Sequence, residues 1–198
     1  MSSLFGAITT EVPKFTSVFK SGEYEIRKYA CQIRASTDYM GDGPAFRTIA
    51  KYIFGGNRGS GGGDGSVKVA MTAPVLTTSR SGDKEKGDKV AMTAPVVTSK
   101  GKMSFIMPAE YTSIAQLPVP LDSSVTLEEV PEYSSAVIQF SGWATVARAA
   151  AKETQLRAWC ARDGVTLEGA ASLAQYNPPW TLLWRTNEVM INVSVAAD

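Results

Sequence analysis

The stretch KVAMTAPVLTT at residues 68–78 returns 21 positions later as KVAMTAPVVTS at residues 89–99. Each copy is rich in β-branched residues and carries one proline, which cannot donate a hydrogen bond to a neighbouring strand. We therefore expect two similar strands, with a bend or a sheet edge at Pro74 and Pro95. The charged, glycine-containing segment 79–88 between the copies suits an exposed hairpin connection.

The segment before the repeat predicts an amphipathic helix over residues 42–54. Asp42 is the expected N-cap, and the pair Gly55–Gly56 is expected to end the helix. One face is apolar and should pack against the core; it carries, at the i, i+3, i+4 and i+7 spacing, Phe46, Ile49, Ala50 and Ile53. Arg47 and Lys51 lie one helical turn apart on a different face.

A glycine-rich loop with seven glycines follows this helix over residues 55–66. It lacks the residue spacing of a phosphate-binding loop, and no predicted strand leads into it. The loop is therefore interpreted as a flexible connection and not as a nucleotide site.

The remaining elements repeat one order along the chain. A strand over residues 23–35 needs a bulge at Arg27–Lys28, because the parity of its apolar side changes there. A second helix is expected over residues 143–162, with Gly164 as its stop. Further strands are expected over residues 103–107, 125–130, 132–140, 180–185 and 188–195. This order predicts an α+β fold of two similar strand–helix–strands halves, with the helices on a curved antiparallel sheet or open barrel.

Composition narrows the class of protein. The chain has 198 residues, 44% of them hydrophobic, which suits one globular domain. Its 20 basic and 19 acidic residues are interspersed, so the basic stripe of a nucleic-acid-binding protein is not expected. No apolar stretch approaches the roughly 20 residues of a membrane span, and residues 1–15 lack the basic start of a secretory signal. The two distant cysteines, Cys31 and Cys160, are expected to be reduced thiols of a cytosolic protein.

The sequence contains no histidine. This removes the commonest general base and the commonest metal ligand, and with them the Ser-His-Asp and Cys-His catalytic sets and the usual zinc sites. Acid–base catalysis would fall to Glu, Asp, Tyr or Lys, and no motif places two carboxylates together. Composition therefore favours a binding protein over an enzyme.

Nine segments along the chain resemble, in order, the SOUL haem-binding proteins. They are YEIRKY (24–29), FRTIAKYIFGGN (46–57), the two KVAMTAPV copies, MSFIMP (103–108), LPVPLDSSV (117–125), AVIQFSG (136–142), YNPPW (176–180) and RTNEV (185–189). The likeness runs from about residue 10 to residue 195 and predicts a single SOUL-type domain over residues 1–198. It implies a distorted antiparallel β-barrel flanked by two helices, in agreement with the order of elements.

The resemblance also implies non-covalent binding of haem or a related tetrapyrrole in an apolar groove beside the first helix, by a carrier or buffer. The contact residues carried over to this chain are Phe46, Arg47, Ile49, Ala50, Lys51, Met71, Met92 and Trp180. Arg47 and Lys51 would meet the two propionates of a porphyrin. Two departures weaken the match: the first helix lacks the methionines of some members, and Thr181 stands where some carry a lysine.

The iron ligand is left open by the sequence. No histidine is present to hold iron, which leaves Met, Tyr, Cys or Lys side chains. Met71, Met92, Tyr52 and Cys31 are the named candidates, and Cys31 is expected to face the core. The simplest hypothesis has no protein ligand and binds the ring by burial and charge alone.

Competing interpretations also remain open. Arg47 and Lys51 can be solvated surface charges, and Met71 and Met92 can be gap-fillers in the core. The chain can also be an enzyme that removes the metal from a tetrapyrrole or opens its ring. In a third hypothesis it is an interaction protein with a vestigial groove, whose partner would belong to tetrapyrrole metabolism.

Overall fold

The computed structural model describes residues 10–39, 41–60, 65–78, 101–177 and 185–194. In chain order the elements are β1 (Phe15–Lys20), β2 (Glu25–Tyr29), β3 (Gln32–Asp38), α1 (Asp42–Ile53), β4 (Asn57–Arg58), β5 (Val75–Thr78), β6 (Lys102–Ile106), the 3-10 turn η1 (Ile114–Gln116), β7 (Val119–Pro120), β8 (Thr126–Val130), β9 (Tyr133–Ser141), α2 (Val146–Arg162), β10 (Leu167–Gln175) and β11 (Thr186–Val193).

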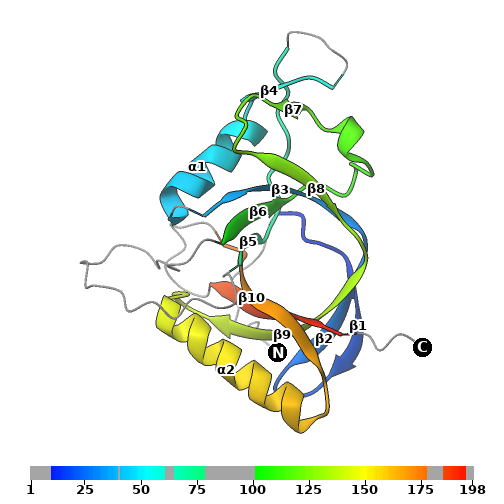
Figure 1. The fold of residues 1–198 in the computed structure, drawn as a ribbon, viewed down its shortest axis with the longest axis vertical. Coiled ribbons are helices and arrows are strands. Elements are labelled where there is room, and N and C mark those ends of the chain that lie inside the picture. Colours follow the sequence, from blue (N-terminus) through cyan, green and yellow to red (C-terminus); the bar gives the residue numbers. More distant parts are fainter. Residues whose placement is uncertain (1–9, 40, 61–64, 79–100, 178–184, 195–198) are drawn as a thin grey trace.

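Within the described residues, nine strands form one curled sheet in the order β1-β2-β9-β11-β10-β5-β6-β3-β8 (Figure 1). Every pairing in this sheet is antiparallel. The order begins with β1 and ends with β8, so these two strands are its edges. Each helix follows one strand-rich segment, α1 after β3 and α2 after β9. The expected α+β fold, an open antiparallel barrel with two helices, is confirmed.

Three layers of buried side chains hold the barrel and its helices together. Helix α1 covers β3 and β6 over a cluster that includes Ile33, Ala35, Ile49, Ile53 and Phe105. Helix α2 covers β9, β10 and β11 over a cluster that includes Ala136, Ile138, Leu156, Cys160 and Ile191. A third cluster includes one residue from each of six strands of the sheet, Tyr29, Leu76, Ile106, Val137, Ala174 and Met190. Because the central strands β9 and β11 contribute to two clusters, both of their faces are buried.

The two ends of α2 are set by local chemistry. The hydroxyl of Thr145 accepts a hydrogen bond from the backbone N–H of Arg148 and caps the helix, so α2 begins three residues later than expected from the sequence. At its other end Gly164 adopts φ 74°, the left-handed conformation that glycine tolerates best, and the predicted stop is confirmed.

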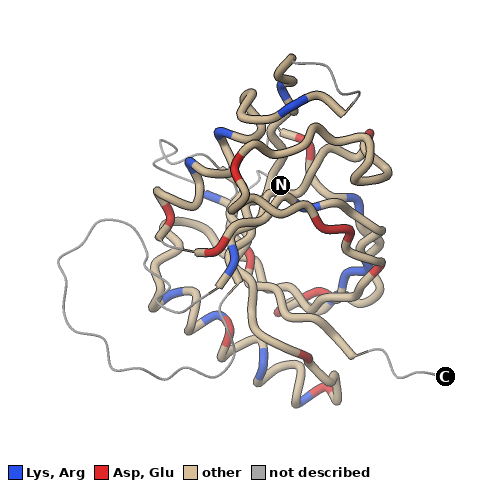
Figure 2. Tube along the Cα trace, turned by 45° about the horizontal axis from the view of Figure 1, so that its top comes forward, with Lys and Arg blue, Asp and Glu red and all other residues tan. Residues whose placement is uncertain are grey.

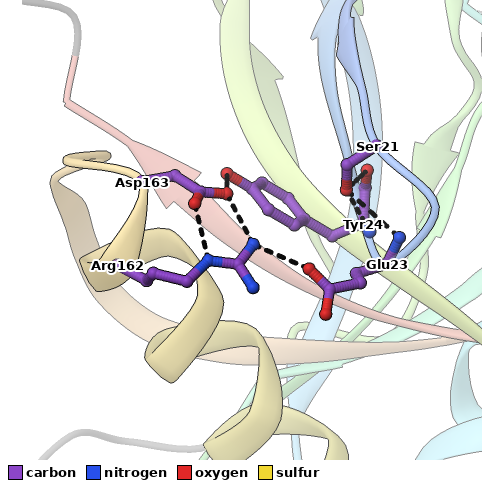
Figure 3. Close-up of polar contacts among 5 residues, drawn as sticks. All are labelled: Ser21, Glu23, Tyr24, Arg162 and Asp163. Atoms are coloured by element: carbon purple, nitrogen blue, oxygen red, sulfur yellow. Dashed lines mark hydrogen bonds and ion pairs between the residues drawn. The ribbon is translucent and has the colours of Figure 1, made fainter.

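A polar cluster joins the end of α2 to the start of β2 (Figure 3). The phenol of Tyr24 donates a hydrogen bond to Asp163 Oδ2 at 3.0 Å, and Arg162 bridges Asp163 and Glu23, with 2.7 Å separating its Nη2 from Glu23 Oε2. The hydroxyl of Ser21 accepts hydrogen bonds from the backbone N–H groups of Glu23 and Tyr24 and fixes the turn before β2. The cluster therefore orients α2 on the sheet.

The single strand expected over residues 23–35 is wrong, because the structure has two separate strands there. Strand β2 pairs with β9 in unbroken register, without a bulge at Arg27–Lys28, and the chain breaks instead at Ala30–Cys31. After this break β3 joins the opposite edge region of the sheet, between β6 and β8. A change of strand, and not a bulge, explains the change in apolar parity.

The first copy of the repeat forms a strand only after its proline, since β5 begins at Val75. The second copy, at residues 89–99, lies outside the described residues, as does most of the strand expected over residues 180–185. Among the helices that the structure describes, none is long and apolar enough to cross a membrane.

Candidate functional site

Helix α1 carries most of the residues expected to contact a ligand. Its cap lies one residue earlier than predicted, because Gly41, with φ 100°, occupies the N-cap position and Asp42 is the first helical residue. Asp42 is therefore not the cap; its Oδ1 accepts a hydrogen bond from the Tyr39 hydroxyl at 2.8 Å. Burial raises the pKa of Asp42, although the hydrogen bond from Tyr39 opposes this shift.

The apolar residues predicted on α1 lie mainly against the core. Ile49 is fully buried, with 0% exposure, and the half-buried ring of Phe46 packs on Phe105 at a centroid distance of 5.3 Å. Ala50 is partly buried. These side chains support α1 from beneath and leave little of their own surface for a ligand.

Arg47 and Lys51 are both exposed on α1, one helical turn apart as expected. The guanidinium of Arg47 lies over Gly43, where an added Cβ would be 3.3 Å from Arg47 Nη1. Lys51 lies against Gly56, where an added Cβ would come within 2.7 Å of the Lys51 carbonyl oxygen and 2.9 Å of its Cγ. Glycine at these two positions therefore gives both basic side chains room to lie close to the backbone.

Three exposed apolar side chains lie near the C-terminal end of α1, and the sequence did not predict them as contacts. Phe54 is 58% exposed, Val119 58% and Leu121 62%. The backbone brings them close together, because β4 pairs with β7 and the N–H of Leu121 donates to the Gly56 carbonyl at 3.2 Å. The signal available in the sequence was Phe54 itself, which lies seven residues after Arg47 and so continues the stripe of Arg47 and Lys51.

We call this surface the α1 rim: the apolar Phe54, Val119 and Leu121, with the exposed basic residues Arg47, Lys51 and Arg58. Arg58 joins it because β4 residue Arg58 pairs with Val119. Hydrogen bonds from Ser124, and to a smaller extent the charge of Lys51, hold the pKa of Asp122 below its ordinary value, so one carboxylate also lies near the rim. The chemistry of the rim suits an apolar ligand with more than one negative charge.

The charge distribution of the whole chain, unlike that of the α1 rim, gives no preference for an anionic ligand. Figure 2 shows basic and acidic positions interspersed along the trace, and the net charge of the whole chain is +1. Local groups, and not a field from the whole molecule, must therefore decide where an anionic ligand binds.

The candidate iron ligands fall in different environments. Met71 is partly buried and packs on the cluster beneath α1. Tyr52 is 1% exposed, and its hydroxyl donates to the Pro118 carbonyl at 2.9 Å. Burial, assisted by nearby Tyr111, raises the pKa of Tyr52 to about 12, so the group is a phenol at neutral pH. The structure presents Tyr52 as a core residue.

Cys31 was expected to face the core, and this is wrong. It lies in the connection between β2 and β3 and is exposed. Met92 and Trp180, the other two predicted contacts, lie outside the described residues.

A buried ion pair in the barrel was also missed by the sequence. Arg27 Nη1 lies 2.9 Å from Glu188 Oε1, and the side chains are 10% and 3% exposed. Glu25 pairs with the same guanidinium at 2.8 Å, and the Tyr176 hydroxyl donates to Glu188 Oε2 at 2.5 Å. Burial is the largest single influence and lowers the pKa of Arg27, but attraction by Glu188 and the contacts with Tyr29 and Glu25 together outweigh it and raise this pKa.

A separate cavity of about 620 Å³ opens beside the connection from β2 to β3. Its walls are made by residues 11–14, 30–33, 106–109 and 129–131, with a few neighbours, and it shares no residue with the α1 rim. Cys31 is in its wall, together with Glu11, Lys14 and Glu129. Within the described ranges, no group of three or more Cys, Asp or Glu side chains converges as a metal site would require.

Comparison with known proteins places these features in context. A model of the SOUL heme-binding protein family matches residues 10–85 and 80–192. Heme-binding protein 1 of Sus scrofa is 27% identical over 208 residues, covering 96% of this chain and 95% of that protein. Heme-binding protein 1 of Mus musculus is 28% identical over 202 residues, with coverage of 96% and 95%.

Similar solved structures share the fold at low sequence identity. The crystal structure of a hydrolase from Listeria innocua superimposes with a TM-score of 0.57 at 12% identity, covering 89% of this chain and 94% of that one. The C-terminal domain of EcmrR superimposes with a TM-score of 0.53 at 13% identity, covering 86% and 98%. These two likenesses concern the arrangement of strands and helices alone.

Proposed function

This chain belongs to the SOUL heme-binding protein family, and from that premise we propose that it binds haem or a related tetrapyrrole non-covalently. Its role would be that of a cytosolic carrier or buffer. The observation that carries the proposal is the α1 rim, where exposed apolar side chains lie beside exposed basic ones. A porphyrin is a flat apolar ring with two carboxylates at one edge, and it needs both kinds of group at one surface.

We assign the contacts on the rim as follows. Phe54, Val119 and Leu121 would meet the ring, since they are the apolar side chains there with most of their surface free. Arg47 and Lys51 would meet the two propionates, with Arg58 as a further cation at the edge. Phe46, Ile49 and Ala50 belong to the site as its support, and Met71, Met92 and Trp180 remain predicted contacts.

The affinity can be bounded from the size of such a contact. Burial of about 400 Å² of apolar surface gives a gross gain of about 10 kcal/mol. Association costs of about 4–15 kcal/mol consume much of that gain. At the lower end of that cost about 6 kcal/mol remains, and two charge contacts of about 0.5–1 kcal/mol each bring the total to about 7–8 kcal/mol. The expected dissociation constant is then about 1–10 μM, at which binding is reversible, as a carrier or buffer requires.

We propose that iron has no ligand from this protein at the rim. Tyr52 is buried with its hydroxyl engaged, and the thiol of Cys31 belongs to the separate cavity. Haem would be the cargo, and any redox chemistry would be that of the haem itself. The residues of the rim would only hold the ring and its propionates. Haem and iron-free protoporphyrin IX are therefore expected to bind with dissociation constants within about threefold of each other.

The test is a titration of the purified protein with haem and with protoporphyrin IX, followed by the Soret band and by quenching of tryptophan fluorescence. Replacing Arg47 and Lys51 together by Ala is expected to weaken both ligands about tenfold, since each exposed charge pair contributes about 0.5–1 kcal/mol. Replacing Phe54 and Leu121 together by Ala should weaken both ligands at least as much.

The matched control removes two exposed cations elsewhere, Lys28 and Lys102, whose side chains are 48% and 52% exposed. The affinity of this control variant for haem and for protoporphyrin IX should equal that of the wild type. Equal loss in the control and in the Arg47/Lys51 variant would contradict the assignment of the rim. Much weaker binding of protoporphyrin IX than of haem would contradict the absence of an iron ligand, and absence of binding by either would favour an interaction protein.

A further inference from the structure

The cavity beside the connection from β2 to β3 has the size and lining of a ligand site. Its volume of about 620 Å³ falls within the range of about 300–1,000 Å³ typical of small-molecule pockets. Apolar side chains such as Ile33, Met107 and Val130 form much of its wall. Segments far apart in sequence form it: residues 11–14 lie next to the edge strand β1, and residues 129–131 lie at the end of the other edge strand, β8.

Its charged groups differ in sign from those of the α1 rim. Two carboxylates, Glu11 and Glu129, and one ammonium group, Lys14, line the cavity. One oxygen of each carboxylate is fixed by the backbone: Glu11 Oε1 accepts from Ala109 N–H at 3.0 Å, and Glu129 Oε1 accepts from Ile114 N–H at 3.1 Å. The second oxygen of each has no hydrogen-bond partner among the described residues, so it can accept a bond from a ligand.

A third acceptor lies in the same wall. The side-chain nitrogen of Gln32 donates to the Tyr133 hydroxyl at 2.8 Å, which leaves its oxygen, Oε1, to accept. That oxygen is buried and, in the part of the chain that the structure describes, has no partner. A buried acceptor without a partner is costly, and this oxygen is closed off from solvent.

We propose that this cavity is a second ligand site, distinct from the α1 rim, which takes a small aromatic or aliphatic molecule bearing a protonated amine. The free oxygens of Glu11 and Glu129, and an excess of one carboxylate over the single ammonium group, favour a ligand with N–H donors and a positive charge. The same carboxylates repel the propionates of a tetrapyrrole. The two sites therefore select ligands of opposite charge.

The chain contains its own reporter for this cavity. Cys31 is exposed and lines the cavity, whereas Cys160, on the buried face of α2, is 0% exposed. Burial raises the pKa of the Cys160 thiol and keeps it protonated. A thiol reagent should therefore alkylate Cys31 first, and a ligand in the cavity should slow that reaction.

The experiment compares three probes that share one ring and differ in charge: 1-naphthylmethylamine, 1-naphthylmethanol and 1-naphthylacetate. Alkylation of the full chain by iodoacetamide is followed at neutral pH by intact mass, with increasing probe. The concentration of protonated amine that halves the alkylation rate of Cys31 is expected to be about fivefold lower than that of the alcohol. The acetate is expected to protect Cys31 least. Alkylation of free cysteine under the same conditions corrects for reaction with the probes, and Cys31→Ser identifies the labelled site.

Two variants test the origin of the charge preference. Glu11→Gln with Glu129→Gln keeps the oxygens that accept from Ala109 and Ile114 and should abolish the preference for the amine. Lys14→Ala removes the opposing cation, leaves both carboxylates in place and should enlarge the preference; it also serves if the double variant does not fold.

Absence of protection by the amine, or equal protection by the acetate, would overturn the proposal, as would a preference that survives in the folded Gln variant. The outcome is independent of the tetrapyrrole site. Haem at saturating concentration should leave the alkylation rate of Cys31 unchanged, and the amine should leave haem affinity unchanged.

Discussion

Replacing Glu188 by Gln removes the partner of a buried cation and keeps the shape of the side chain. The carboxylate of Glu188 is 3% exposed and lies 2.9 Å from Arg27 Nη1. Breaking a buried ion pair at one partner costs about 3–5 kcal/mol, because the remaining charge loses its compensation. Glu25 still pairs with Arg27 at 2.8 Å, so we expect the lower end, a loss of about 3 kcal/mol in the free energy of unfolding.

The hydrogen bond from Tyr176 should survive this change, since the Gln oxygen also accepts. The loss in the free energy of unfolding therefore measures the removal of the negative charge. Urea unfolding, followed by circular dichroism and tryptophan fluorescence, measures it. The matched control is Glu132→Gln, which removes the same charge from an exposed pair whose side chains, Lys28 and Glu132, are 48% and 55% exposed. That control should cost less than about 1 kcal/mol.

A second variant isolates the uncompensated charge. Adding Arg27→Met to Glu188→Gln removes the buried cation, so the double variant should lose less than the sum of the two single losses. Equal losses for Glu188→Gln and Glu132→Gln would refute the reasoning, because the pair would then behave as a solvated one. Strict additivity in the double variant would refute it independently.

Two further predictions concern stability. Burial raises the pKa of Tyr24 and of Tyr52 to about 12, above the ordinary value of about 10, so their contribution to the free energy of unfolding is complete below about pH 9 and is lost between about pH 10 and pH 12. Urea unfolding across that range should show a shallower fall for Tyr24→Phe than for the wild type, and an identical fall would contradict the role of Tyr24. Gly56→Ala should cost about 1–3 kcal/mol, because its Cβ would lie 2.7 Å from the Lys51 carbonyl oxygen. Gly22→Ala, where nothing lies within 4 Å, is the control and should leave the thermal midpoint unchanged.

Hydrophobic periodicity correctly predicted the helices and strands that bury one apolar face against the core. Residues 46–53 recur at helical spacing, and α1 is found there; residues 132–140 alternate, and β9 is found there. The exact start of α1 was not predictable, because Gly41 and Asp42 both fit an N-cap and only the backbone dihedral angles decide between them.

Elements without a pattern were missed. Strand β10 reads LEGAASLAQ, in which small residues and a glycine hide any alternation, and its place is fixed by pairing with β11 and β5. Strand β1 is exposed along its whole length and gives no burial signal. Tertiary pairing overrides local propensity in β10.

The candidate site was predictable in its basic residues and less so in its apolar ones. Arg47 and Lys51 were identified by their spacing on one helix. Phe54, Val119 and Leu121 come together only because β4 pairs with β7, about sixty positions along the chain, and two-residue strands leave no periodic signal. The burial of Arg27 likewise depends on its long-range partner Glu188, which no local pattern indicates.

The edge position of β1 has a consequence for how water reaches the interior. Edge strands open locally at a lower free energy than the centre of a sheet, so the amides of β1 should exchange with solvent deuterium well before those of β9 and β11. The ring of Phe15 on β1 covers the guanidinium of Arg27 at 4.3 Å from its centroid. Each fraying event of β1 therefore uncovers Arg27 and its partner Glu188 while the central strands stay folded. The hydration of this ion pair is then governed by the opening equilibrium of one strand, on a timescale much shorter than that of global unfolding.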